Sequence, residues 1–283
     1  MQNILLMYSG GLDSRLAVKI LKDAGYTLRA AFFSLPFASR YPGGKDFLEE
    51  EGIPLEIFDC TKGYLLRDYM HMLQQPVHGR GKGFNPCVDC KLFMIKHLED
   101  FAGKNGYGAI ATGEVPGQRP MSQTSKKMKT IQEETSLPLI RPLKELGIHG
   151  RNRKKQIRLA HSYQIHYPLP AGGCLLCEKE MKKRFETLIH NNLIQEDTLP
   201  LATLGRHFFD PHHKQWFVVG RDKSENDVIE KYQQVIVSGK GKPAVYYHFS
   251  SQPEKTRKEA EALQQAYQEK DTAAIRGYSV WKL

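Results

Sequence analysis

The sequence predicts an α/β protein with a doubly wound parallel sheet and a second, smaller α+β domain. Over the first half of the chain, short apolar runs bounded by glycines alternate with amphipathic stretches of helical period. This alternation is typical of parallel strands joined by helical crossovers. The last hundred residues instead combine two strand candidates with one long polar helix. We therefore expect two domains, 1–180 and 181–283.

The individual elements follow from the spacing of apolar residues. The expected strands are 3–8, 28–35, 55–60 and 109–112 in the first domain, and 216–219 and 244–249 in the second. The expected helices are 14–24, 44–51, 64–73, 90–102 and 254–270. In a parallel sheet the ligand site lies beyond the carboxyl ends of the strands, where loops enter helices. The motifs that carry chemistry fall at such loops.

Length and composition exclude several classes of protein. The chain has 283 residues, of which 40% are hydrophobic and 25% charged, so a mostly disordered chain is excluded. No apolar run approaches the roughly 18 residues that cross a bilayer. The first residues, MQNILLMYSGG, lack the basic segment of a signal peptide. Five cysteines are too few for a disulfide scaffold. We expect a cytoplasmic protein without a membrane partner.

The formal net charge of +10 is concentrated in one segment. Residues 119–158 hold 11 basic and 3 acidic residues, whereas residues 1–118 hold 13 of each. Clustered Lys and Arg side chains favour a polyanion, because neutralising phosphates releases counterions. The segment therefore indicates a nucleic acid partner, and the alternative is a solvated surface segment.

The SGGLDS motif at residues 9–14 lies between the first expected strand and the first expected helix. Its glycines let the backbone approach an anion, and the helix start offers unpaired N–H groups and the positive end of a dipole. The serine hydroxyls add donors, and the aspartate is suited to holding Mg²⁺ against phosphates. An ordinary strand–turn–helix connection is the alternative. The candidate nucleotide ligands are Ser9, Gly10, Gly11, Asp13 and Ser14.

An SGGLDS motif after an N-terminal strand resembles the signature of the PP-loop ATP pyrophosphatase superfamily. The resemblance implies the Rossmann-like sheet of adenine nucleotide alpha hydrolases, with ATP and Mg²⁺ bound at this loop. It also implies that the enzyme adenylates its substrate and releases pyrophosphate. By the same resemblance, the backbone at residues 32–34, with Phe33, would contact adenine.

A second group of motifs resembles enzymes that thiolate tRNA. The TGE at 112–114, with the GQ and SQ pairs that follow, resembles the catalytic domain of tRNA 4-thiouridine synthetases, as does the LIRPL segment at 139–143. The NPC at 85–87 resembles tRNA 2-thiouridylases. Together the resemblances cover about residues 1–180. They imply nucleotide contacts at Gly113 and Glu114, although Glu114 also suits a helix-capping carboxylate. Side chains suited to orienting the uridine are Gln118, Arg119, Ser122 and Gln123.

The cysteines form two CxxC pairs, Cys87 with Cys90 and Cys174 with Cys177, and Cys60 stands alone. Cys87, Cys90 and Cys174 resemble the ligand pattern of cluster-dependent thiolation enzymes, which implies a [4Fe–4S] cluster with one open iron. Two alternatives stay open, a persulfide carried by one cysteine and a Zn²⁺ site completed by Cys177. The expected catalytic residues are Asp13, Cys87, Cys90 and Cys174. Cys60 is expected to be a buried small hydrophobe.

The VVGRDKSEND stretch at residues 218–227 resembles the start of an NFACT-type RNA-binding domain. We expect Arg206, Arg221 and Lys223 to hold phosphates, and Phe208 and Trp216 to stack on bases. The alternative is a small α+β domain with a charged turn.

These observations predict an ATP-dependent tRNA uridine sulfurtransferase, with tRNA and a sulfur donor (sulfide or a persulfide carrier) as partners and a homodimer as a possible state. One alternative is a PP-loop ligase or sulfurtransferase that acts on a small molecule. The other is an RNA- or ribosome-binding protein that only senses ATP.

Overall fold

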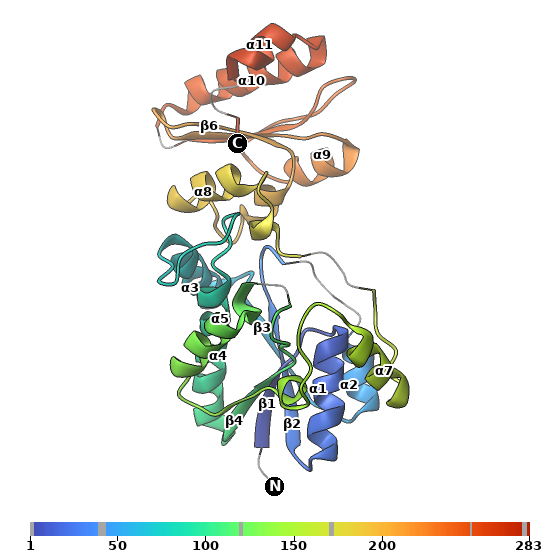
Figure 1. Cartoon of the computed structure of the whole chain (residues 1–283). Helices are drawn as coiled ribbons and strands as arrows, with labels where there is room; N and C mark the ends of the chain where they lie inside the picture. Colours follow the sequence, from blue (N-terminus) through green and yellow to red (C-terminus); the bar gives the residue numbers. More distant parts are fainter. Residues whose placement is uncertain (1–2, 39–43, 119–120, 170–172, 250, 279–281) are drawn as a thin grey trace. The chain divides into compact units, whose positions relative to one another are not determined.

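The structure is a computed structural model, and it describes residues 3–38, 44–118, 121–169, 173–249, 251–278 and 282–283. The chain divides into two compact units, Met1–Lys179 and Glu180–Leu283 (Figure 1). The functions expected of the two domains stay predictions.

The first unit is built on a five-stranded sheet. Its strands are β1 (Asn3–Met7), β2 (Thr27–Ser34), β3 (Leu55–Asp59), β4 (Ala109–Thr112) and β5 (Leu139–Ile140). They lie in the order β3-β2-β1-β4-β5, and all four neighbouring pairs are parallel. Ile4, Leu5 and Leu6 of the central strand are buried, because both faces of a parallel sheet are covered by helices. The predicted α/β fold is confirmed.

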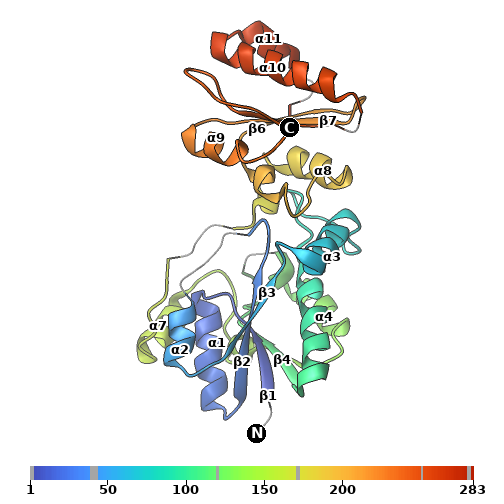
Figure 2. The ribbon, with the colours of Figure 1, turned by 180° about the vertical axis from the view of Figure 1, so that it is seen from behind.

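Helices cover the two faces of this sheet. They are α1 (Leu12–Asp23), α2 (Lys45–Glu50), α3 (Gly63–Gln74), α4 (Cys87–Asn105), α5 (Ser125–Glu133), α6 (Pro142–Glu145) and α7 (Lys154–Ser162). Figures 1 and 2 show α1, α2 and α7 on one face and α3, α4 and α5 on the other. Helix α6 packs against α1 and therefore belongs to the first group.

Two departures from the sequence prediction affect the site. Helix α4 begins at Cys87, not at residue 90, so the first CxxC pair lies in its first turn. The apolar periodicity that predicted this helix only becomes visible after Cys90. The short strand β5 and the basic helices α5 and α7 were not predicted. Each of these two helices buries only two side chains, so the sequence shows no clear apolar periodicity there.

The second unit holds a four-stranded antiparallel sheet. Its strands are β6 (Arg206–Asp210), β7 (Gln215–Val219), β8 (Val235–Ile236) and β9 (Val245–His248), in the order β6-β7-β9-β8. Its helices are α8 (Lys182–His190), α9 (Lys223–Ile229), α10 (Pro253–Glu269) and α11 (Thr272–Gly277). Helix α10 packs its Ala260 and Leu263 against the sheet. This second, smaller α+β domain is as predicted.

The aromatic residues expected to stack on RNA bases are instead part of the core of the second unit. Phe208 and Trp216 are 1% and 0% exposed. Trp216 donates its indole N–H to His207 Nδ1 at 3.1 Å. The expectation that these two rings stack on bases is therefore wrong. Among the helices of the described residues, none combines the length and the apolar composition that crossing a bilayer requires.

Candidate nucleotide and thiol site

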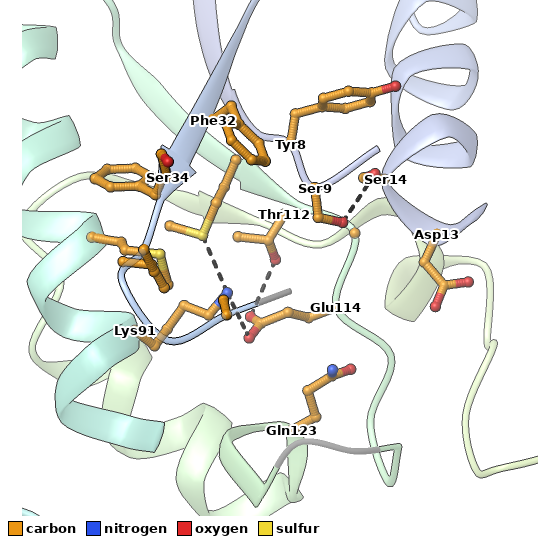
Figure 3. A pocket seen from close by; sticks show the side chains of 16 residues that line it. Tyr8, Ser9, Asp13, Ser14, Phe32, Ser34, Lys91, Thr112, Glu114 and Gln123 are labelled. Atoms are coloured by element: carbon orange, nitrogen blue, oxygen red, sulfur yellow. Dashed lines mark hydrogen bonds and ion pairs between the residues drawn. The ribbon is translucent and has the colours of Figure 1, made fainter. Parts of the chain in front are cut away.

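A cavity of about 340 Å³ opens at the carboxyl ends of β1, β2 and β4 (Figure 3). The strand order reverses between β1 and β4, and ligands of open parallel sheets bind at such a switch point. Side chains from the ends of these three strands, the start of α1 and the second turn of α4 line the cavity. Those labelled in Figure 3 are Tyr8, Ser9, Asp13, Ser14, Phe32, Ser34, Lys91, Thr112, Glu114 and Gln123.

The loop at residues 9–14 is packed so closely that glycine is required around it. Gly10 has a φ of +78°, in the left-handed region. A Cβ at Gly113 would lie 2.6 Å from the Asp13 carbonyl oxygen, and one at Gly44 would lie 2.9 Å from Gly10 Cα. The TGE segment therefore packs directly on the backbone of the loop. Gly44 was not predicted as part of this site.

The polar groups of the loop form hydrogen bonds with one another or with the side chain of Arg15. Ser9 Oγ donates to Ser14 Oγ at 3.3 Å, and Ser14 Oγ donates to the Gly11 carbonyl at 2.8 Å. The buried Arg15 donates its Nε–H to the Gly10 carbonyl at 2.9 Å. Gly11 caps α1 without any side-chain hydrogen bond, so the first amides of the helix face the loop. This arrangement suits an anion.

Asp13 lies half-buried in the first turn of α1 and lines the cavity. Its Oδ1 has no hydrogen-bond partner among the described residues. Burial raises the pKa of Asp13, and the charge of Arg153 and the nearby Gln156 amide only partly oppose this shift. An orphaned buried carboxylate oxygen beside an anion-binding loop fits a hard divalent cation such as Mg²⁺.

Glu114 is 5% exposed and lies between two cations. Its Oε1 lies 3.4 Å from Lys91 Nζ, and its Oε2 lies 3.3 Å from Arg141 Nε and accepts from Thr112 Oγ1 at 3.2 Å. Burial opposes the ionised form, but Lys91 and Arg141 outweigh it and lower the pKa of Glu114. The carboxylate therefore holds the Lys91 ammonium at the cavity wall. Lys91 was missed in the sequence, where its only signal is its place directly after Cys90.

Residues 32–34 line the other side of the cavity. Phe33 is 8% exposed, and its ring stacks on Phe58 with centroids 4.6 Å apart. Because side chains alternate along a strand, Phe32 and Ser34 point to the opposite face from Phe33. The predicted contact of this segment with adenine is untested.

The residues expected to orient a substrate lie in different settings. Gln123 lines the cavity, and its Oε1 accepts the Val115 amide at 2.8 Å. Ser122 is 1% exposed, and Gln118 is half-buried with its Nε2 unpartnered among the described residues. Arg119 lies outside the described residues. Their substrate roles stay predictions.

The two CxxC pairs are brought together by backbone packing. Cys87 and Cys90 lie in the first turn of α4, and Cys174 is the N-cap and Cys177 the last residue of a 3₁₀ turn at Leu175–Cys177. The Phe84 amide donates to the Leu176 carbonyl at 2.8 Å. A Cβ at Gly83 would lie 2.5 Å from that carbonyl oxygen, so the two segments are in contact.

The four thiols interact with one another. The pKa of Cys177 is raised, first by its hydrogen bond with Cys174, against the opposite effect of its hydrogen bond with Cys87. Burial raises the pKa of Cys90 to about 12, with a further contribution from Cys87. Cys177 is the exposed member of the four. The cluster prediction leaves Cys177 out and only the zinc alternative includes it, yet the fold places it among the other three. Cys60 is buried, as expected.

The two segments that carry these thiols border the cavity. Lys91, which lines the cavity, is the residue after Cys90, and Ala38, another lining residue, pairs with Cys174 in an isolated β-bridge. Within the described parts of the chain, no three Cys, His, Asp or Glu side chains are arranged as a ready metal site. The chemistry of the donors nevertheless fits soft metals, because thiolates bind both iron–sulfur clusters and zinc.

The parallel sheet and the glycine loop at its switch point define a nucleotide-binding fold of the PP-loop type. The model of the ThiI family, described as "Thiamine biosynthesis protein (ThiI)", matches residues 1–164. This match covers more than half of the chain, which therefore belongs to the ThiI family.

Similar proteins include enzymes named for tRNA modification. The chain is 30% identical over 144 residues to a probable tRNA sulfurtransferase of Aeropyrum pernix. This match covers 49% of this chain and 34% of that protein. It is 24% identical over 264 residues to the tRNA-specific 2-thiouridylase MnmA of Campylobacter concisus, covering 80% and 74% of the two. A crystal structure of a 4-thiouridine synthetase–RNA complex with bound ATP matches with a TM-score of 0.43 and 21% identity, over 71% of this chain and 52% of that one. The chain thus spans about a third of the length of the sulfurtransferase it matches.

Proposed function

We propose that the chain is an ATP-dependent tRNA uridine sulfurtransferase. In this reaction a uracil carbonyl oxygen is adenylated and pyrophosphate leaves, and sulfur then displaces the activated oxygen, which departs as part of AMP. The observation that carries the proposal is the direct contact between the thiol segments and the nucleotide cavity, through Lys91 beside Cys90 and Ala38 paired with Cys174. Activation and sulfur delivery must occur at the same carbon atom, so the two sites have to adjoin.

The nucleotide would lie across the carboxyl ends of the strands. The backbone at residues 32–34 would contact the base, and the amides at the start of α1 would bind the phosphates. Asp13, with its orphaned oxygen, would hold Mg²⁺. These groups stabilise the negative charge that develops on the departing pyrophosphate, because they are already oriented before the reaction.

Sulfur would be delivered by Cys87, Cys90 and Cys174, which we propose as ligands of a [4Fe–4S] cluster. Such a cluster with three protein ligands supplies an iron that is free to carry inorganic sulfide. The protein's own contribution is to hold these thiols beside the cavity, through the contact of Gly83 and Phe84 with Leu176.

The tRNA would be held by the basic segment. On α5, Lys126 and Lys129 are exposed, and on α7, Lys154, Lys155 and Arg158 are exposed. Such side chains neutralise backbone phosphates without selecting a sequence. The second unit is a further candidate for RNA contact through Arg206, Arg221 and Lys223. A cytoplasmic location and dimerisation stay predictions.

A second candidate function is sulfur transfer to a small molecule. The description of the matching family names thiamine biosynthesis, and the same adenylation chemistry would serve a free acceptor. This candidate predicts ATP turnover without RNA, whereas the tRNA reaction requires RNA for turnover.

Mass spectrometry of tRNA nucleosides from a strain lacking the gene tests the proposal. We expect one thionucleoside to disappear and to return when the intact gene or a Cys60→Ala variant is supplied, but not with Asp13→Asn. An unchanged set of thionucleosides, together with ATP turnover in the absence of RNA, would contradict the tRNA reaction and favour the small-molecule acceptor.

A further inference from the structure

The side chain of Asn85, just before helix α4, is directed at a cysteine sulfur. Asn85 is 8% exposed, and its Nδ2 donates a hydrogen bond to Cys87 Sγ at 3.2 Å. An asparagine at a helix start ordinarily accepts a backbone N–H through its side-chain oxygen. Oδ1 of Asn85 has no hydrogen-bond partner among the described residues, so this side chain does not cap α4. The buried amide therefore serves the sulfur and not the helix.

The backbone at Gly81 holds this amide in place. The Gly81 N–H donates to the Asn85 carbonyl at 2.9 Å and closes a turn. A Cβ at Gly81 would lie 2.6 Å from Nδ2 and 2.7 Å from Oδ1 of Asn85, so the side-chain amide packs directly on the Gly81 backbone. The amide thus contacts both Gly81 and the sulfur of Cys87, and these two contacts fix its orientation.

Stability alone does not account for an asparagine at this position. A buried oxygen without a partner costs stability, and an apolar side chain of the same size would avoid that cost. What the amide supplies is an N–H directed at Cys87 Sγ. Hydrogen bonds to ligating sulfurs orient them and tune the reduction potential of the iron–sulfur cluster that they bind. The contact therefore has a chemical use at a metal-binding thiol.

We propose that Asn85 is a positioning residue of the thiol site, whose side-chain N–H orients Cys87 Sγ and tunes the cluster that Cys87 would ligate. This inference rests on the cluster of the proposed function and deepens it. Asn85 acts through the sulfur, and Gly81 acts through Asn85 by keeping space for the amide. The asparagine of the NPC stretch thereby has a role towards the cysteine two residues further on.

Redox titration of the full chain, purified without oxygen, tests this role with Asn85→Leu, because leucine is similar in size but has no N–H. The reduction potential of the cluster should become more negative, since a hydrogen bond to the sulfur stabilises the more negatively charged reduced form. Iron content and stability to urea should not fall, because the variant also removes the unpaired oxygen. The matched control is Asn105→Leu, which removes an exposed amide at the other end of α4 and should leave the potential unchanged.

Gly81→Ala provides a second measurement that leaves Asn85 itself unaltered. Its methyl group would displace the amide from the sulfur, so the potential should shift in the same direction as in Asn85→Leu. An iron-containing Asn85→Leu chain with the original potential, or one that loses iron and stability together, would overturn the role of Asn85 and leave the proposed function intact. An original chain that holds no iron would contradict the proposed cluster, and the role of Asn85 with it.

Discussion

Two residues at this site have contacts that exclude most substitutions. One contact excludes a larger side chain, and the other requires a negative charge. Gly113 touches the backbone of the nucleotide loop, and Glu114 lies between Lys91 and Arg141. The first is a steric constraint and the second an electrostatic one. Each can be tested by one substitution with a matched control.

Gly113→Ala should destabilise the chain and weaken ATP binding. Its new methyl group would lie 2.6 Å from the Asp13 carbonyl oxygen, so the nucleotide loop must shift, at a cost of roughly 1–3 kcal/mol. The control is Gly103→Ala in α4, where no atom lies within 4 Å. Since alanine favours helix, this variant should gain up to about 1 kcal/mol. Urea unfolding measures both, and equal effects of the two substitutions would refute the packing argument.

Glu114→Gln should cost about 3 kcal/mol at neutral pH, because it leaves two largely buried cations without a counter-charge. The pKa of Glu114 is lowered in the folded chain, so its stabilisation is present above the unfolded value of 4.5 and is lost as the pH falls through the folded-state pKa. The stability gap between the original chain and the variant should therefore shrink on acidification below 4.5.

Urea unfolding across this pH range measures the gap. Glu49→Gln, at an exposed pair with Lys45, is the control and should cost less than about 1 kcal/mol. A gap for Glu114→Gln that stays constant or widens at acid pH would show that the carboxylate is not the charged partner of Lys91 and Arg141.

At the scale of elements, the start of α4 and the 3₁₀ turn at Leu175–Cys177 together make the thiol site. Neither element could do so alone, because each supplies only one CxxC pair. The contact between Gly83 and Leu176 joins them.

Chain purified without oxygen should be brown and contain iron, and Cys174→Ala should lose both the colour and the iron. Removing one of three thiolate anchors exposes the cluster to release. Cys60→Ala, which alters a buried thiol outside the two CxxC pairs, should keep its iron. Absorbance and metal analysis give the answer.

The same experiment separates the other roles of the thiols. Cys177→Ser should retain iron if three cysteines hold the cluster. Colourless original chain with one zinc, lost in Cys177→Ser, would contradict the cluster and support a four-cysteine zinc site. Colourless chain carrying an extra sulfur atom on a cysteine would support a persulfide.

At the scale of the whole molecule, the strand order β3-β2-β1-β4-β5 creates the site by placing three strand ends around one cavity. The alternation of strands and helices, the strand-to-helix position of SGGLDS and the two CxxC pairs were all readable from local patterns. The short strand β5 and the basic helices α5 and α7 were not, because their burial depends on neighbours distant in sequence. The same reason applies to the buried Phe208 and Trp216, whose side chains are in the core only because of the sheet that forms around them.

The fold class, the nucleotide loop and the candidate thiols could be predicted from local patterns, since each depends on residues that lie close together along the chain. Which distant side chains join them depends on the folding of the whole sheet. Lys91 and Arg141 reach Glu114, and Cys177 meets Cys174 and Cys87. These pairings arise because a parallel sheet gathers loops separated by many residues at one edge, and no local pattern records which charges or thiols will meet there.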